Sequence, residues 1–285
     1  MCMLEDALEQ LQISPLSCEL IRSKDGIAVY RIETQKEKMV LKVFEKPENR
    51  REIENYRLLG NLGIRTLPVK GCTEQVLMLP DMNFSKKFRM GNEVDLNDTQ
   101  VARAIAKWYR QLHDEGKKYL KHHSVSMYDE LDKITLENIR RIAAVTYSID
   151  NELWRMIESQ FDAVKKKMAD LPRTLTYNDF YWDNLIVAKD RTEAFMFDYN
   201  LLGKGTAYGD VRNVTSSMSK IAAEAFCEVY DTSEVESEKI ADDILSHLVT
   251  LCIACEREKF PIWAEKSKEL LLSGELQQRF MKWMG

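Results

Sequence analysis

The chain changes its pattern of apolar and polar residues about a third of the way along. Residues 40–44 and 76–79 are apolar runs of strand length, and Pro80 ends the second run. Between these runs, residues 51–59 place their apolar side chains at helical spacing. The pattern therefore predicts strands and one helix in the first eighty residues.

Long amphipathic helices are predicted from Asn97 onward. In residues 101–113, the apolar positions recur at the spacing of one buried helix face, and we expect this helix to end at His113. Two more helices are predicted at 128–147 and 151–169, with Pro172 stopping the second one. The buried stripe of the first helix consists of Val101, Ile105, Trp108 and Leu112.

A short hairpin in the middle of the chain carries polar residues at one end. Residues 185–187 and 194–197 are apolar strands separated by a polar turn, so Asn184 and Asp198 should lie side by side. Phosphoryl transfer requires a carboxylate that orients the attacking hydroxyl and oxygen ligands that hold Mg²⁺. We assign the first role to Asp179 and the second to Asn184 and Asp198. Alternatively, these are ordinary turn-forming residues of a hairpin.

Lys42 is a second unusual feature, because it lies inside an apolar run. Burying a lysine is costly unless it meets an anion, and nucleotide phosphates would supply one. The helix that follows offers two carboxylates on different faces, Glu52 and Glu54. Alternatively, Lys42 extends to solvent from an edge strand and both glutamates are solvated.

Taken in this order, the motifs resemble the aminoglycoside phosphotransferase and choline kinase family of small-molecule kinases. The catalytic loop of that family usually reads His-Gly-Asp-x-x-x-x-Asn, followed by an Asp on the next strand. Here Tyr177-Asn178 replaces His-Gly, so we expect Tyr177 to brace the loop in a different way. The family's Arg-Glu-x-x-x-x-x-Leu-Leu pattern favours Glu52 as the partner of Lys42.

The resemblance implies an α+β, protein-kinase-like fold of two lobes. A small N-lobe with an antiparallel sheet and one helix would span residues 1–80, and a larger, mostly helical C-lobe would span 81–285. It also implies ATP, with GTP as an option, and Mg²⁺ as cofactors, with Lys42 gripping the α- and β-phosphates. The expected nucleotide contacts are Ser23 and Gly26 in the covering loop, Ile27, Val40, Met78 and Leu79 against adenine, and the hinge backbone near Leu79 and Asp81. A plain Asp-Gly hairpin turn at residues 24–26 is an equally good account of that loop.

The acceptor is the least specified part of this interpretation. The acidic segment 224–243 would complement a cationic substrate, with Glu224 and Glu228 as local candidates, although charged helix faces are usually just solvated. Tyr181 and Trp182, close to Asp179, could hold a cation over their rings. Asp210 would support the catalytic loop through backbone N–H groups or Arg212, and a helix N-cap is the alternative.

Composition excludes several other classes of protein. The net charge of −5 argues against nucleic acid as a partner. No stretch reaches the roughly 18 apolar residues of a membrane span, and no signal-peptide run is present, so we expect a cytoplasmic protein. Cys252 and Cys255 form a CxxC motif inside an apolar helical run. Without a second Cys or His pair, we assign them to the core and not to a zinc site.

The sequence therefore predicts a phosphotransferase that moves the γ-phosphate of ATP to a hydroxyl of an aminoglycoside-, choline- or sugar-like molecule. A catalytically silent, kinase-like scaffold that binds nucleotide or a partner helix is the alternative. A protein kinase is disfavoured, because the segment 198–210 is short for an activation loop and lacks Ala-Pro-Glu. The sequence sets no oligomeric state.

Overall fold

The computed structural model describes residues 3–285 and divides into two compact units. The first unit contains the described residues up to Glu115, together with Tyr177–Leu202 and Asn213–Tyr230. The second contains Gly116–Thr176, Gly203–Arg212 and Asp231–Gly285. These units are not the two lobes expected on either side of Pro80, and that lobe division stays a prediction.

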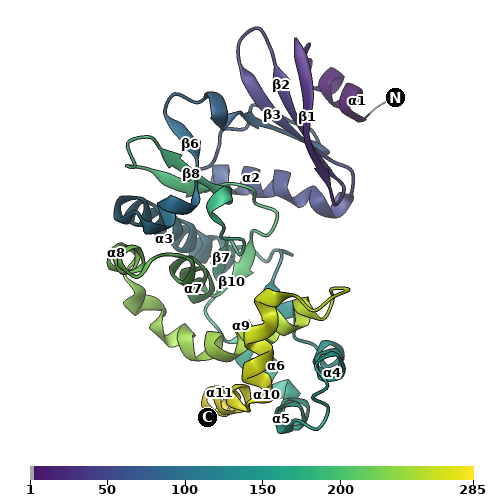
Figure 1. Ribbon diagram of the computed structural model, residues 1–285, viewed down its shortest axis with the longest axis vertical. Helices are drawn as coiled ribbons and strands as arrows, with labels where there is room; N and C mark the ends of the chain where they lie inside the picture. The colour runs from purple at the N-terminus through teal and green to yellow at the C-terminus, as the bar shows by residue number, and fades with distance from the viewer. Residues whose placement is uncertain (1–2) are drawn as a thin grey trace. The chain divides into compact units, whose positions relative to one another are not determined.

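A five-stranded antiparallel sheet forms the N-terminal part of the first unit (Figure 1). Its strand order is β1-β2-β3-β5-β4, with each neighbouring pair antiparallel. Asp25 (φ 53°) and Gly26 (φ 82°) are both left-handed, which is the backbone that a two-residue hairpin between β1 and β2 requires. The strands are β1 (Ser17–Lys24), β2 (Ile27–Glu33), β3 (Lys38–Phe44), β4 (Gly71–Cys72) and β5 (Val76–Pro80).

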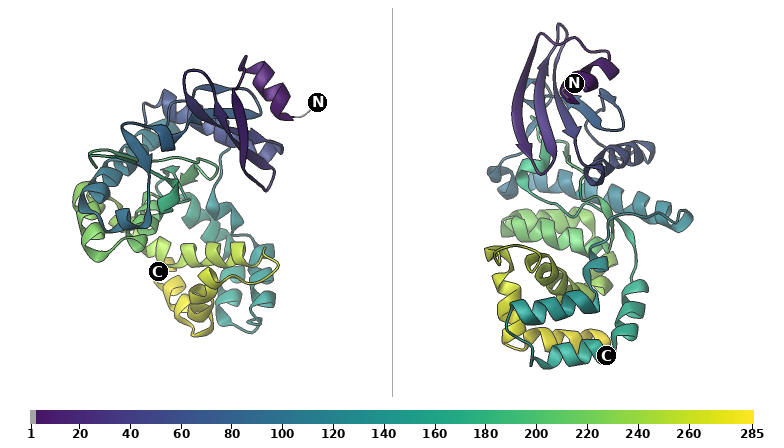
Figure 2. Two further views of the ribbon diagram at one scale, coloured as in Figure 1. Left: turned by 45° about the horizontal axis from the view of Figure 1, so that its top comes forward. Right: turned by 90° about the vertical axis from the view of Figure 1, so that its right-hand side faces the viewer.

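The two faces of this sheet are covered by different helices. Helix α1 (Met3–Gln10) lies against one face, as both views in Figure 2 show. The core on that side contains Leu41 and Met78, which are paired across β3 and β5. Helix α2 (Arg51–Asn61) contacts the opposite face, because its Glu52 meets Lys42.

The rest of the first unit surrounds a three-stranded sheet with the order β6-β8-β9. The predicted hairpin corresponds to β8 (Leu185–Ala188) and β9 (Ala194–Met196), and β6 (Phe88–Met90) pairs with β8. Helix α3 (Thr99–His122) begins in this unit, and α8 (Lys220–Tyr230) completes it. The predicted stripe of α3 is confirmed, since Val101, Ile105, Trp108 and Leu112 are all buried.

The predicted end of α3 at His113 is wrong, because the helix continues to His122. Gly116 lies within it and does not act as a stop signal. A Cβ at this position would overlap the backbone nitrogen of Leu175 and come within 2.6 Å of Thr174 Oγ1. The glycine therefore allows β7 (Thr174–Thr176) to pass directly against α3, and β7 pairs with β10 (Gly203–Gly205).

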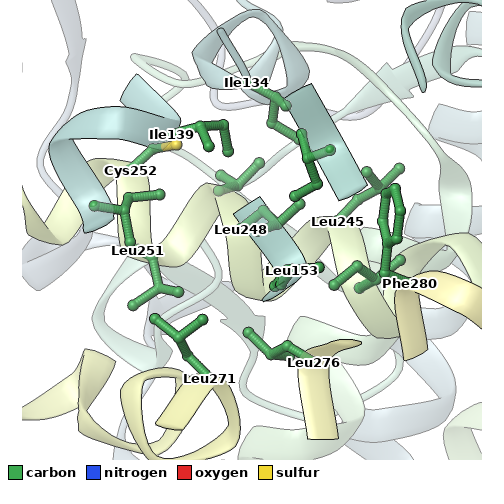
Figure 3. Close-up of a cluster of buried hydrophobic side chains, with 14 of the residues drawn as sticks. Ile134, Ile139, Leu153, Leu245, Leu248, Leu251, Cys252, Leu271, Leu276 and Phe280 are labelled. Carbon is green, nitrogen blue, oxygen red and sulfur yellow. The ribbon is translucent and has the colours of Figure 1, made fainter. Parts of the chain in front are cut away.

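The second unit is mainly helical and buries one large apolar core. Side chains of α9 form the middle of this core, and residues from α4, α5, α10 and α11 surround them (Figure 3). Cys252 is part of it, as predicted. The helices are α4 (Leu136–Val145), α5 (Glu152–Ser159), α6 (Phe161–Ala169), α7 (Ala207–Ser217, shared with the first unit), α9 (Lys239–Ala254), α10 (Glu265–Leu272) and α11 (Glu275–Met284).

Two predicted helices of this region are shorter than expected. The first was expected at 128–147, but Thr135 caps α4 by accepting a hydrogen bond from the Asn138 backbone, so α4 begins only at Leu136. The second is divided at Gln160, whose φ of −118° is not helical. Over residues 3–285, no helix combines the length and the apolar character needed to cross a membrane.

Candidate functional site

Lys42 is buried on β3 and contacts a carboxylate of α2. Its Nζ donates to Glu52 Oε1 at 2.8 Å and to Glu52 Oε2 at 3.1 Å, and Glu52 is fully buried. Glu54, the other candidate, is exposed and pairs with Arg57 at 2.6 Å. The structure thus brings Lys42 together with Glu52 and not with Glu54, as the alternation of helix faces requires.

Asp198, which is half-buried, is the third member of this charge cluster. Its Oδ1 lies 3.2 Å from Lys42 Nζ, and its backbone is left-handed with a φ of 62°. Burial works to lower the pKa of Lys42, but the charges of Glu52 and Asp198 outweigh it, and the net shift is upward. Burial also raises the pKa of Glu52 to about 7, against the opposing effect of the Lys42 ammonium. One ammonium is therefore shared by two carboxylates.

Helix α2 is fastened to the segment that follows Asp198. The Glu52 carboxylate accepts the backbone N–H of Tyr199, and Asn55 Nδ2 donates to the Tyr199 carbonyl at 2.7 Å. The rings of Tyr56 and Tyr199 meet edge to face, with 4.7 Å between their centroids. The position of α2 and the position of Asp198 are consequently coupled within the first unit.

Asp179 and Asn184 are joined by hydrogen bonds across their loop. Asn184 Nδ2 donates to Asp179 Oδ2 at 3.1 Å and to the Asp179 carbonyl at 3.2 Å. Because the Asn184 amide nitrogen donates both hydrogen bonds, the amide oxygen is the atom left to coordinate a metal ion. The Asn184 carbonyl accepts from Phe197 N at 3.0 Å, so the β8–β9 hairpin places Asn184 and Asp198 at the same end.

The carboxylate of Asp179 is a stronger base than an exposed aspartate. Burial raises its pKa, the negative charge of Asp198 raises it further, and the Asn184 hydrogen bond opposes both effects. A carboxylate with a raised pKa is better suited to accept a proton from a hydroxyl as a new bond forms.

Tyr177 connects the loop that carries Asp179 to the Asp198 segment. It is fully buried, and its hydroxyl donates to the carbonyl oxygens of Phe197 at 2.5 Å and Asp198 at 3.3 Å. Asn178 has a left-handed φ of 65°, and its Nδ2 donates to the Leu201 carbonyl at 2.9 Å. The Tyr-Asn pair therefore braces the loop through two separate hydrogen-bonded links.

Asn200 is a site residue that the sequence reasoning missed. Its Nδ2 donates to Asp198 Oδ1 at 2.6 Å, while its own Oδ1 is buried and has no hydrogen-bond partner in residues 3–285. A buried oxygen without a partner is costly, and a bound cation would satisfy it. In the sequence, only its position two residues after Asp198 could have indicated that Asn200 belongs to the site.

These oxygen groups fit a hard divalent cation. Mg²⁺ sites of this type use one or two carboxylates, and the substrate phosphates and water supply the remaining ligands. Asp198, Asn184 and Asn200 meet that requirement. No cluster of three or more His, Cys, Asp or Glu side chains suited to a metal occurs in the described part of the chain.

Strand alternation separates the residues expected around adenine. Val40 pairs with Leu79 on the face of the sheet that carries Lys42. Met78 points to the other face, where it joins the core beneath α1, so the structure does not place it with Val40 and Leu79. Ile27 is half-buried at the start of β2.

The remaining candidates for nucleotide contacts are Asp81, Ser23 and Gly26. The Asp81 N–H donates to the Lys38 carbonyl at 3.2 Å, and its buried carboxylate pairs with Arg31 at 2.7 Å, so Asp81 fixes the hinge and its N–H is not available to a base. Ser23 is exposed near the end of β1. Gly26 turns close to Lys46, whose Cγ would lie 2.9 Å from an added Cβ.

The substrate candidates lie at the surface. Tyr181 is 63% exposed and Trp182 is 40% exposed, which leaves their rings available next to Asp179 in the chain. Glu228 pairs with Arg103 at 2.7 Å, and Glu224 is also exposed on α8.

The acidic segment 224–243 does not form one solvated face. Asp242 is buried and pairs with Arg212 at 2.6 Å, and the buried Glu238 accepts the Tyr208 N–H at 2.8 Å. Asp210 is buried inside the first turn of α7, so the N-cap alternative is wrong. Asp242 and Glu238 therefore serve the internal structure of the second unit, and the supporting role of Asp210 stays a prediction.

Comparison with solved structures identifies the fold. The choline kinase LicA from Streptococcus pneumoniae superimposes with a TM-score of 0.63 at 14% identity, covering 97% of this chain and 99% of that one. A choline/ethanolamine kinase family protein from Mesorhizobium loti gives 0.62 at 14% identity, with 99% of each chain covered. The streptomycin-ATP-APH(2")-IIa ternary complex gives 0.56 at 12% identity, covering 99% of this chain and 96% of the other.

No family model and no curated protein sequence matches the chain. The likeness is therefore one of three-dimensional structure, and it extends over almost the whole chain. It confirms the α+β, kinase-like fold and, at the level of the fold, the resemblance that the motifs indicated.

Proposed function

We propose that this chain, which has the fold of choline kinases and aminoglycoside phosphotransferases, transfers the γ-phosphate of ATP to a hydroxyl group of a small molecule. The observation that carries the proposal is the buried Lys42–Glu52 pair with the half-buried Asp198 beside it, together with Asp179 and Asn184 in the same unit. A phosphotransferase needs this set of a cation for phosphates, oxygen ligands for a metal and a carboxylate for the hydroxyl.

The residues divide the work as follows. Lys42, held by Glu52, would bind the α- and β-phosphates, and Asp198, Asn184 and Asn200 would hold Mg²⁺. When bound, Mg²⁺ neutralises charge on the phosphates during transfer. Asp179 would orient the hydroxyl of the acceptor and take its proton.

Several finer points belong to the same proposal. ATP is supported by the streptomycin-ATP-APH(2")-IIa complex, and GTP stays an option because Val40 and Leu79 offer only apolar contact to a base. The acceptor would be a hydroxylated small molecule, and the exposed rings of Tyr181 and Trp182 favour one with a cationic group. A cytoplasmic location rests on the sequence alone and stays a prediction.

A thermal-shift titration tests the nucleotide site. Ligand binding raises apparent stability by mass action, so ATP with Mg²⁺ should raise the melting temperature of the wild type. Asp198→Ala should lose the Mg²⁺-dependent part of this shift. Asp190→Ala is the matched control, because Asp190 lies in the exposed turn of the same hairpin. GTP in place of ATP identifies the preferred base.

The same titration separates the proposal from its alternative. A kinase-like scaffold is favoured by one observation, the Tyr177-Asn178 pair in place of the family's His-Gly. If neither nucleotide shifts the melting temperature, the phosphotransferase proposal fails and the scaffold replaces it. If the nucleotide binds, turnover with hydroxylated amines and its loss in Asp179→Asn complete the test.

A further inference from the structure

The second unit contains a cavity of about 410 Å³ that the proposed reaction does not use. Its walls come from the end of α3, the loop that leads to residue 133, α6, and the residues beside β7 and β10. Leu120, Met168 and Ala169 give it an apolar side. The other side carries basic groups from four separate parts of the chain: His123, Lys165, Arg173 and Lys204.

Arg173 lines this cavity and is partly exposed. Its Nη2 forms an ion pair with the buried Asp129 carboxylate, which fixes the position of the guanidinium. A fixed guanidinium offers directed donors to an anion, so an anion beside it would be stabilised.

Lys165, Lys204 and His123 are also available to bind an anion. Lys165 and Lys204 both line the cavity, and neither pairs with an acidic residue in the described chain. His123 is stacked on Tyr119, with 4.4 Å between ring centroids, and its Nδ1 lies 2.9 Å from the Tyr119 carbonyl. Its Nε2 thus stays available to a ligand.

The acidic groups of the cavity do not cancel this charge. One oxygen of Asp129 accepts from the Leu131 N–H at 3.0 Å, and the other pairs with Arg173, so its charge is compensated internally. Asp132 also lines the cavity, and its exposed carboxylate offsets one of the two lysine charges. The net charge of the groups that line the cavity is therefore positive.

We propose that this cavity binds a small molecule that carries a phosphate group. A phosphate offers several acceptor oxygens, which match the guanidinium of Arg173 and the two ammonium groups of Lys165 and Lys204, each from a different part of the chain. The apolar wall formed by Leu120 and Met168 would contact the organic part of the ligand. The proposal concerns the second unit alone and does not depend on the proposed function.

Two of these basic residues lie on or beside paired strands. Arg173 directly precedes β7, and Lys204 lies on β10, the strand that pairs with β7. A phosphate held by both residues would bridge these strands.

Isothermal titration of inorganic phosphate into the full chain tests the site. The titration contains EDTA, so that no metal holds phosphate elsewhere, and ionic strength is kept constant with sodium chloride. Lys204→Ala and Lys165→Ala should each weaken binding by about tenfold or more, the usual effect of losing a charged hydrogen bond. Lys166→Ala is the matched control, because Lys166 is an exposed neighbour on α6 outside the cavity. Arg173 is not substituted, because its loss would leave the buried carboxylate of Asp129 without its counter-charge.

The outcomes are distinct. Saturable binding that is lost in the two cavity variants and kept in Lys166→Ala supports the site. Absence of saturable binding overturns the proposal. So does saturable binding that both cavity variants keep, because the phosphate would then occupy another site. Circular dichroism and melting temperature confirm that each variant is folded.

Discussion

Removing the Tyr177 hydroxyl tests how the unusual loop is built. Tyr177→Phe keeps the buried ring, which packs against Trp108, Tyr109 and Tyr199, and deletes only the donor to the carbonyls of Phe197 and Asp198. A lost hydrogen bond that leaves buried acceptors behind costs about 1–2 kcal/mol. We expect the free energy of unfolding to fall by this amount.

The expected change is large enough to measure. In a chain of this length, each 1 kcal/mol lowers the melting temperature by about 2–4 °C. Urea unfolding gives the free energy directly through the shift of the midpoint at constant slope. Tyr147→Phe is the control, because Tyr147 is 93% exposed and its hydroxyl is solvated, so its midpoint should not move.

A second effect should appear at the metal site. Asp198 holds a left-handed backbone, which costs a residue with a side chain on the order of 1 kcal/mol or more, and the Tyr177 hydroxyl helps to retain it. Without that bond, the concentration of Mg²⁺ that half-saturates the ATP-dependent thermal shift should rise about fivefold for each 1 kcal/mol lost. An unfolding midpoint and Mg²⁺ dependence equal to the wild type would refute the bracing role.

Three further predictions follow from particular contacts. Asp179→Asn should reduce turnover by about 10²–10⁴-fold and leave the ATP thermal shift unchanged, and normal turnover would contradict its role as base. Burial lowers the pKa of His247 to about 4, so the native state favours the neutral ring. The stability this gives is present above pH 6.5 and lost as the pH falls towards 4. The wild type should therefore lose more unfolding free energy between pH 7 and pH 4.5 than His247→Gln does, by up to about 3 kcal/mol. Urea unfolding at the two pH values measures this difference. Gly116→Ala should cost about 1–3 kcal/mol by overlap with Leu175, whereas Gly60→Ala, with no atom within 4 Å of its added Cβ, should be neutral or stabilising; equal effects in thermal unfolding would argue against the close contact.

The sequence was sufficient where local rules decide the structure. The hairpin around residues 189–192 follows from two apolar runs and a polar turn, and β8 and β9 form as predicted. The turn at Asp25 and Gly26 is also predictable, because Asp and Gly adopt the left-handed backbone of a tight hairpin more easily than most residues do. Side chains alternate between the two faces of a strand, so Val40 and Leu79 share one face of the sheet and Met78 lies on the other. The strand sequences alone imply this separation.

Long-range packing explains what the sequence did not reveal. Gly116 looks like the end of a helix, and only the approach of β7 shows why the helix continues through it. Asp242 belongs to an acidic segment that suggests a solvated surface, yet its pairing with Arg212 depends on a residue 30 positions away. The unsatisfied oxygen of Asn200 is a property of burial, which the sequence around it does not encode.

The charge balance of the site argues for a bound divalent cation. The acidic groups Glu52, Asp179 and Asp198 influence one another electrostatically, and Lys42 forms ion pairs with two of them, Glu52 and Asp198. Because the pKa of Glu52 is about 7, this carboxyl is partly protonated near neutral pH, but the carboxylates still carry more negative charge than one ammonium balances. A divalent cation would compensate this excess charge and also satisfy the buried amide oxygen of Asn200. A cation at this position would also make the surrounding carboxylates compatible with the phosphate-bearing ligand of the proposed function.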